Sequence, residues 1–470
     1  MIKKLFLTIS VCFLFSIAKA QQYSLFNTKT LYDAFENPSV KAFTLDSSRK
    51  FASNFLLPNF TLNASNNGSA NNLIRKIINE GIYDSSLLPL GKGGVNTLNI
   101  NSNIYLLTLR IFSSYKYNQE IGLAWQLRSD VQANYTNETL GILQNYKHFS
   151  DQPYNNALNN NAYQQNYHQF SISIRENLNK RLAFGLKLSA LSGITYNSAA
   201  INNSNLLIDE TNDRISASIN GSYKASFIKD SEVDNSTFSP TFKNPGFSVS
   251  FGTTYNSKSG YFIMANIKDL GFINWRKTAH VANYGFNVTV DNISSKSNTE
   301  ITDEITANIT NTESQQNFIT PTNAKADFLV SRTFNFYKPS LIVSKNLFHK
   351  GGDVAWVNTF KLNAFSASVT PTYNFSNFLM VGVQGMYQTP NFEFFLGTDD
   401  LTKTTSLIKG ITQANASVGA GHIGASFYMG IGIKVGKKVE HPQNLSSMPG
   451  VKGNKNYKGF FRSLFNAFRF

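Results

Sequence analysis

The sequence contains one cysteine among its 470 residues, and that residue, Cys12, lies close to the N-terminus. Residues Met1–Ala20 have the plan of a secretory signal peptide, with two early lysines, an apolar core from Leu5 to Ile17 and a small-x-small cleavage site. Removal of this signal peptide leaves an exported chain without cysteine. Such a chain has no disulfide bond, no thiolate nucleophile and no cysteine metal site.

Long apolar runs are also missing, because no stretch after residue 20 approaches the roughly 20 apolar residues that a membrane-spanning helix needs. Charged residues make up 15% of the chain, and the formal net charge of +15 is spread along it. No dense basic block with interleaved aromatic residues stands out, so we expect no nucleic-acid partner. The low charge fits half-polar strands joined by Asn- and Ser-rich loops.

Signatures of chemistry are absent as well. The six histidines are scattered, with no pair at the spacing of metal ligands. There is no G-x-S-x-G nucleophile elbow and no Walker-type phosphate loop. We interpret the pair Asp399-Asp400 as a polar turn rather than a metal site. We therefore expect no enzymatic activity, no cofactor and no catalytic or metal-binding residue.

Residues His422–Gly436 read HIGASFYMGIGIKVG and show the most regular pattern in the chain. Apolar residues occupy every second position, and the positions between them are small or polar. Because successive side chains of a strand point to opposite sides, this alternation predicts a strand with one apolar face. A soluble sandwich strand usually has about five or six residues, whereas a transmembrane β-strand needs about nine to eleven. Length and alternation together favour a membrane strand.

Comparable strands recur between residues 51 and 436. In Glu120–Gln132, the charged residues lie on one face only, as the lumen of a barrel would produce. We predict an all-β fold, a transmembrane antiparallel β-barrel of about fourteen strands, within a range of about twelve to sixteen. A secreted β-sandwich or adhesin is the alternative. The predicted strands lie within Phe51–Ala64, Leu98–Ser114, Glu120–Gln132, Phe170–Arg175, Arg181–Ala190, Ile215–Phe227, Phe247–Asn256, Tyr261–Lys268, Tyr284–Ile293, Asp327–Phe336, Ser340–Phe348, Ala355–Asn363, Phe365–Phe375, Leu379–Gln388, Phe392–Gly397 and His422–Gly436.

Three long segments without a clear period are predicted as loops: Asn66–Asn96, Ala133–Tyr167 and Ser294–Asn317. The first of them contains an apolar stripe at helical spacing, which predicts a short amphipathic helix inside the loop. The stripe consists of Leu73, Ile74, Ile77 and Ile78.

The segment 21–50 precedes the barrel and does not alternate. Leu31, Ala34 and Phe35 have helical spacing, and Pro38 ends that pattern because proline disrupts a helix interior. We predict a short helix that serves either as a plug inside the barrel or as a cap on its rim, and both readings stay open. Asp269 is predicted at a strand end on the rim. The candidate plug or rim residues are Asp33, Glu36, Asn37, Pro38 and Asp269.

The tail 437–470 is basic and leaves the sheet pattern. Its end has apolar residues at i, i+3, i+4 and i+7, which predicts a short amphipathic helix, on the periplasmic side, that could bind a partner, the barrel mouth or the lipid surface. A partly disordered tail is the alternative. The candidate partner-binding residues are Phe461, Leu464, Phe465 and Phe468.

Four blocks of sequence resemble one known family: QQYSLFNTKTLYDAFENPS, GFSVSFGTTYNSKSGYFIMANIKDLGFINW, FLGTDDL and GASFYMGIGIKVG. They resemble the domain-of-unknown-function family DUF5723 of outer-membrane barrels, which is similar to the PorV and FadL group of Gram-negative bacteria. The resemblance implies an outer-membrane barrel of about fourteen strands and no established activity. In FadL-type proteins an N-terminal segment blocks the lumen, and Asn37-Pro38 matches a dipeptide of that segment.

Two functions follow from this resemblance. One is a FadL-like channel or carrier for hydrophobic or small solutes. The other is a PorV-like scaffold subunit of an envelope or type IX secretion assembly. The expected partners are outer-membrane lipid, a hydrophobic ligand and other envelope proteins.

Overall fold

The computed structural model describes residues 22–438 apart from 44–48, 113–118, 145, 228–234, 277, 298–299, 302, 305–306 and 308–312. The signal peptide and the amphipathic tail helix lie outside the described residues, and so do the tail residues Phe461, Leu464, Phe465 and Phe468. Both therefore stay predictions.

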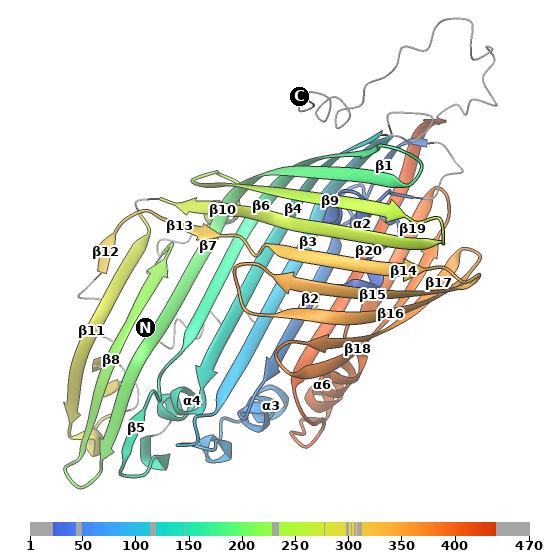
Figure 1. Cartoon of the computed structure of the whole chain (residues 1–470). Coiled ribbons are helices and arrows are strands. Elements are labelled where there is room, and N and C mark those ends of the chain that lie inside the picture. The colour runs from blue at the N-terminus through green and yellow to red at the C-terminus, as the bar shows by residue number, and fades with distance from the viewer. Residues whose placement is uncertain are drawn as a thin grey trace, which may run out of the picture.

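Fourteen antiparallel strands form a closed ring (Figure 1). Strands β1 (Arg49–Ser53) and β2 (Asn59–Asn67) are two halves of the first ring strand, because both pair with β3 and with the last strand, β20. The other ring strands, in order, are β3 (Val95–Phe112), β4 (Gln119–Thr136), β6 (Asn161–Asn177), β7 (Leu182–Asp209), β9 (Asn244–Asn256), β10 (Tyr261–Trp275), β13 with β14 (Phe318–Pro321 and Lys325–Arg332), β15 (Tyr337–Asn346), β16 (Gly352–Leu362), β17 (Phe365–Asn374), β18 (Phe378–Gln388), β19 (Phe392–Thr398) and β20 (Ile423–Lys438).

The side-chain alternation places apolar residues outside and polar residues inside the ring. On β20, Phe427 and Val435 are exposed, whereas Tyr428 and Lys434 are buried. A closed ring leaves no free strand edge, because each ring strand pairs with a neighbour on both sides. Backbone groups that face lipid require such pairing. The prediction of a transmembrane β-barrel is confirmed, and the alternative of a β-sandwich is wrong.

One side of the ring extends far beyond the rest. Strand β7 has 28 residues, well over the roughly nine to eleven that cross a bilayer. Its second half pairs with β8 (Arg214–Ala225), and β8 pairs with β11 (His280–Asp291). Short strands β5 (Pro153–Asn155) and β12 (Glu313–Gln315) complete this extension. Two of the predicted strands, Ile215–Phe227 and Tyr284–Ile293, therefore belong to the extension rather than to the ring.

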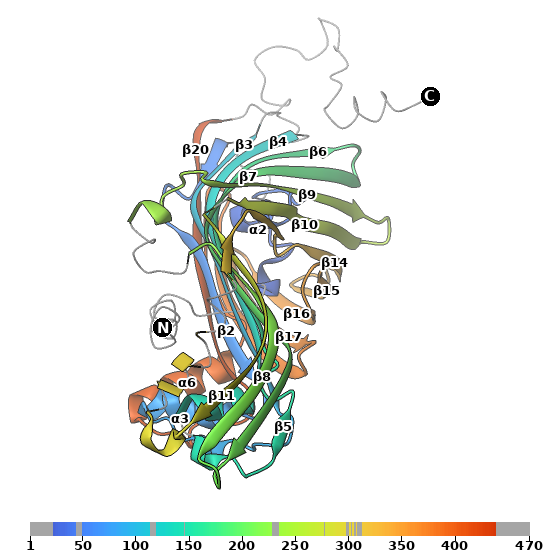
Figure 2. The same cartoon turned by 90° about the vertical axis from the view of Figure 1, so that its left-hand side faces the viewer.

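Helices lie inside the ring and in its connections. The predicted helix in the loop Asn66–Asn96 is α3 (Asn71–Glu80), which packs against α6 (Leu401–Gln413) at one end of the barrel (Figure 2). Among the described residues, no helix has the length and apolar character to span a membrane. The remaining helices are η1 (Tyr23–Leu25), α2 (Leu31–Glu36), η2 (Ser85–Leu87), α4 (Asn137–Gln144), η3 (Tyr146–His148), η5 (Asn235–Phe238) and η6 (Ile293–Ser295).

The prediction of a loop over Ala133–Tyr167 is only partly right. Strand β4 continues to Thr136, α4 follows, and β6 already begins at Asn161. The start of β6 pairs with β4 through residues that are polar on both faces, so no alternation marks it in the sequence.

Candidate functional site

The N-terminal residues 22–43, here called the plug segment, lie inside the ring and are buried along almost their whole length. Helix α2 begins after Thr30, whose hydroxyl accepts a hydrogen bond from the Asp33 amide at 3.1 Å, as an N-cap residue does. It ends before Pro38, which cannot continue a helix. Figure 2 shows α2 between the walls of the barrel.

Groups on strands around the ring bind the plug segment. Tyr23 donates a hydrogen bond to Asp353 on β16 at 2.6 Å, and Arg175 on β6 donates to the carbonyl oxygen of Ser39 at 2.8 Å. Strands so far apart in the ring can be reached together only from within the lumen. The segment therefore fills the barrel rather than capping its rim. Further hydrogen bonds join Asn27 to Ser331, Ser24 to Thr370 and the Leu31 amide to Glu393.

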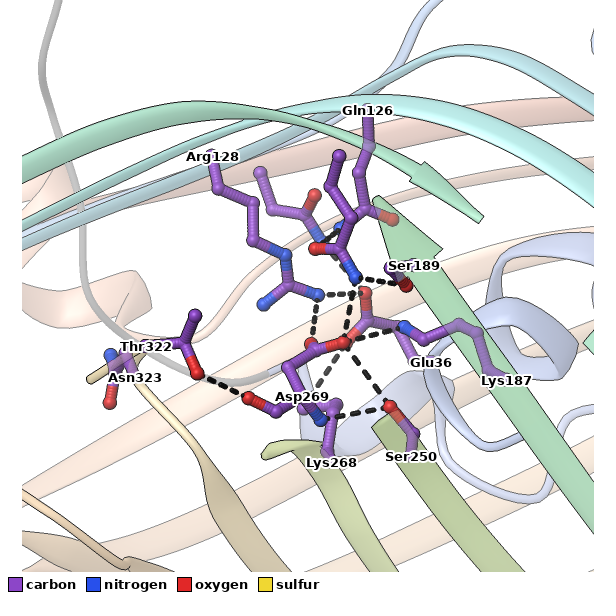
Figure 3. A network of polar contacts seen from close by, with 12 residues as sticks. Glu36, Gln126, Arg128, Lys187, Ser189, Ser250, Lys268, Asp269, Thr322 and Asn323 are labelled. Carbon is purple, nitrogen blue, oxygen red and sulfur yellow. Dashed lines mark hydrogen bonds and ion pairs between the residues drawn. The ribbon is translucent and has the colours of Figure 1, made fainter. Parts of the chain in front are cut away.

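At the end of α2, Glu36 enters a buried ionic network (Figure 3). Its carboxylate lies 2.6 Å from Nζ of Lys268 on β10 and 3.1 Å from the guanidinium of Arg128 on β4. The same guanidinium lies 2.8 Å from Asp269, and Nζ of Lys187 on β7 lies 2.9 Å from the other oxygen of Asp269. Two carboxylates and three cations thus join the plug segment to three strands.

Asp269 is not a rim residue, because it is buried in this network and β10 continues past it to Trp275. The prediction placed a strand end at Lys268 because the alternation breaks there. The break is a β-bulge: Lys268 and Asp269 together lie opposite Ser250 on β9, and Asp269 has a φ of 52°. The bulge turns two successive charged side chains into the lumen.

The Asn37-Pro38 turn packs directly against the wall. Asn37 accepts a hydrogen bond from Asn266 on β10 at 2.9 Å and donates one to Asp33 at 2.9 Å. Pro38 lies so close to Gly185 on β7 that a Cβ at position 185 would be 2.1 Å from the Pro38 carbonyl carbon. Only glycine allows the plug segment to approach the wall here.

The structure thus brings the five candidate plug or rim residues into one region. Asp33, Glu36, Asn37 and Pro38 lie on the plug segment, and Asp269 faces them across Arg128. Their functional roles stay a proposal.

The two acidic residues of α2 lie in different electrostatic settings. Burial opposes ionisation of Glu36, but Lys268 and Arg128 outweigh it and hold the pKa of Glu36 well below its usual range. For Asp33, burial is the larger effect, and hydrogen bonds from Asn37 and the Lys29 amide offset it only in part, so its pKa is raised to about 6. Glu36 is therefore the firmly charged carboxylate of the pair.

The sequence analysis missed the basic partners of Glu36, namely Arg128, Lys187 and Lys268. Each is a charged residue that faces inward in the alternation of a predicted strand. That inward position was the signal in the sequence that could have identified them as lumen residues. A second cluster was also missed. Glu120 lies 3.1 Å from Arg110 and 3.5 Å from Arg175, and it accepts a hydrogen bond from the Ala42 amide at 3.2 Å.

The Asp399-Asp400 pair lies at the start of α6. Asp400 accepts a hydrogen bond from the Lys403 amide at 3.2 Å and lies 2.8 Å from Nε2 of His422. Asp399 is hydrogen-bonded to Ser426 and Asn63. Within the described ranges, no group of three or more His, Cys, Asp or Glu side chains is placed to hold a metal ion.

A closed ring with an apolar outer face and a lumen occupied by its own N-terminal segment defines a plugged transmembrane β-barrel. The chain belongs to the family DUF5723, described as a family of unknown function, whose model matches residues 43–399. Most of the plug segment and all of β20 lie outside that range. The search of the curated proteins gave no match.

Solved structures of other barrels are similar in outline. The toluene transporter TodX of Pseudomonas putida is 8% identical, with 89% of this chain and 93% of that chain covered and a TM-score of 0.39. A FadL homologue of Pseudomonas aeruginosa is 8% identical, with 88% and 95% covered and a TM-score of 0.41. The translocator domain of the autotransporter NalP from Neisseria meningitidis is 6% identical, with 83% and 91% covered and a TM-score of 0.32.

Proposed function

We propose that this protein is an outer-membrane channel or carrier for hydrophobic or small solutes, and that the plug segment gates it. The observation that carries the proposal is the plug segment itself, which occupies the lumen of a fourteen-stranded barrel. Barrels of about 16 strands enclose an aqueous channel, whereas about eight strands leave room only for side chains. A fourteen-stranded ring without its plug would thus leave an open path.

The chemistry of the plug interface supports reversible closure. Much of it consists of hydrogen bonds and ion pairs, such as Tyr23 to Asp353 and Glu36 to Lys268. Water can replace such partners when the segment withdraws, so each hydrogen bond contributes only about 0.5–1.5 kcal/mol net. A segment held in this way can leave the lumen without unfolding the ring.

The proposal is tested by deleting Tyr23–Ser39 and recording conductance in planar bilayers. We expect the whole chain to be closed and the deletion to open a steady conductance, since the cations and polar groups of the lumen would then face water. Uptake of a small hydrophobic solute by cells should fall when the protein is absent. A barrel that shows no conductance with or without the segment, no bound ligand and unchanged uptake would contradict the proposal.

A scaffold role is the second candidate, and the extension favours it. Strands β7, β8 and β11 continue well beyond the ring, and the exposed residues of this extension are mainly polar or charged. Transport does not require such an extension. Gentle detergent extraction followed by mass spectrometry separates the two roles. A protein partner that co-elutes at near-equal amounts would support the scaffold, and a clean barrel carrying a hydrophobic ligand would support the channel.

A further inference from the structure

The wall of the barrel is interrupted between β8 and β9. Residue Ala225 ends the β8 ladder on both sides, and β9 begins at Asn244. On the far side, β10 ends at Trp275 and β11 begins at His280. Arg276, Thr278 and Ala279 therefore have no ladder partner on the described parts of β8 and β9.

A cavity of about 620 Å³ lies at this interruption. Its lining includes Ile194, Lys243, Asn274, Arg276, Thr278 and Asn317. It opens on the outer face of the wall, because Asn274 shares the outward phase of the exposed Phe272, while its two chain neighbours, Ile273 and Trp275, are buried on the inward phase.

The cavity lies where the apolar belt of the wall ends. Phe272 pairs with Phe247, both are exposed, and on the neighbouring strand Ile319 is exposed opposite Asn274. The next outward-facing residue of β10 after Phe272 is the polar Asn274. Such a step marks the boundary at which lipid tails give way to headgroups.

Residues 235–243, which precede β9, fold back over the outer wall beside the cavity. The Phe242 amide donates a hydrogen bond to Ser192 on β7 at 2.9 Å, and the ring of Phe242 lies 5.6 Å from that of Phe170. Phe238 and Phe242 are nevertheless 60% and 41% exposed. Aromatic residues placed in this way are typical of the membrane interface.

The polar side of the cavity offers positive charge. Lys243 and Arg276 both line it and are both exposed, and neither forms an ion pair with another described residue. Two exposed cations without a paired carboxylate favour a group that carries negative charge at this cavity.

We propose that this cavity binds the phosphate-bearing headgroup of a membrane lipid. The phosphate would lie between Lys243 and Arg276, because charge-assisted hydrogen bonds to phosphate are strong. The acyl chains would run down the wall over Phe247 and Phe272. The site lies on the outer wall, apart from the plug segment, so it does not depend on the proposed channel.

Native mass spectrometry of the whole chain, released from nanodiscs that contain phosphatidylglycerol and phosphatidylethanolamine, tests this proposal. We expect one retained phospholipid per barrel. The double variant Lys243→Gln/Arg276→Gln should lower that retention roughly tenfold or more, since each basic side chain near a lipid phosphate adds appreciably to binding. The matched control is Arg181→Gln/Lys258→Gln, which removes the same charge from exposed positions near short turns and should leave retention unchanged.

Inorganic phosphate is added in a second arm to separate a lipid from a free anion. We expect phosphate at millimolar concentration to leave the lipid in place, because it cannot supply the acyl contacts. Equal retention by the double variant and the wild type would overturn the proposal. Displacement of the lipid by phosphate, or retention of an apolar molecule without phosphate, would also overturn it.

Discussion

Two carboxyl groups inside the barrel, Glu36 and Asp399, are buried to a similar degree but have different neighbours. Glu36 lies between Lys268 and Arg128, which hold its pKa well below its usual range against the effect of burial. Asp399 is hydrogen-bonded to neutral groups, chiefly Ser426, and burial raises its pKa to about 8. The charged carboxylate is thus stabilised at Glu36, where two cations face it, and disfavoured at Asp399 beside α6.

Glu36 and Asp399 should therefore contribute to the stability of the fold with opposite dependence on pH. A depressed pKa stabilises the fold above the unfolded value of 4.5, and the Glu36 contribution is lost as the pH falls below it. A raised pKa does the reverse, so the Asp399 contribution is complete below 3.8 and is lost as the pH rises towards about 8.

The largest effect is expected for Glu36→Gln, which leaves Arg128, Lys187 and Lys268 with one carboxylate. Breaking a buried ion pair by removing one partner costs about 3–5 kcal/mol. We expect the plug segment to become accessible to protease and the midpoint of urea unfolding in detergent to fall. Glu210→Gln, at an exposed hairpin, is the control and should change neither. An unchanged midpoint for Glu36→Gln would contradict the claim that the ionic network around Glu36 stabilises the docked plug segment.

A smaller effect is expected for Gly185→Ala, which displaces the plug segment without removing a charge. The added Cβ would lie 2.1 Å from the Pro38 carbonyl carbon, so the segment must shift, and overpacking of this kind costs about 1–3 kcal/mol. Protease cleavage within the plug segment should become faster. Gly385→Ala on β18 is the matched control, since a Cβ there meets no atom within 4 Å. Equal cleavage rates in the two variants would show that the wall does not position Pro38.

The last effect, that of Asp399→Asn, should have the opposite sign. The variant should be more stable than the wild type at pH 7, because the wild type must keep this carboxyl group protonated in the folded barrel while the unfolded chain ionises it. The variant should also lose the fall in stability that the wild type shows between about pH 4 and pH 8. Thermal unfolding measured across that range gives the answer. Wild-type stability that does not change with pH over that range would contradict a raised pKa for Asp399.

Most of the ring could be predicted from the sequence because lipid imposes a strict contrast. On strands such as β17 and β20, every second residue faces hydrocarbon and must be apolar, so a period of two identifies them. The contrast disappears where strands leave the bilayer. Residues Asn161–Tyr167 of β6 are largely polar on both faces, and they were predicted as part of a loop.

The candidate site could be predicted only in part. The helix of the plug segment was predicted from the helical spacing of Leu31, Ala34 and Phe35. The partners of Glu36 could not be assigned, because Arg128, Lys187 and Lys268 lie on three strands that meet only when the ring closes. Asp269 was misplaced for a local reason, since a bulge breaks the period of two.

The plug segment also constrains the order in which the protein can be assembled. It directly precedes β1, and the first and last strands form the closing seam. Its Leu31 amide binds Glu393, 362 residues later in the chain, and the ring of Phe43 lies 5.1 Å from Nζ of Lys434 on β20. Contacts of such sequence separation form late in folding. The plug segment can therefore dock completely only after β19 and β20 have joined the sheet. A barrel whose first and last strands have not paired would lack these plug contacts.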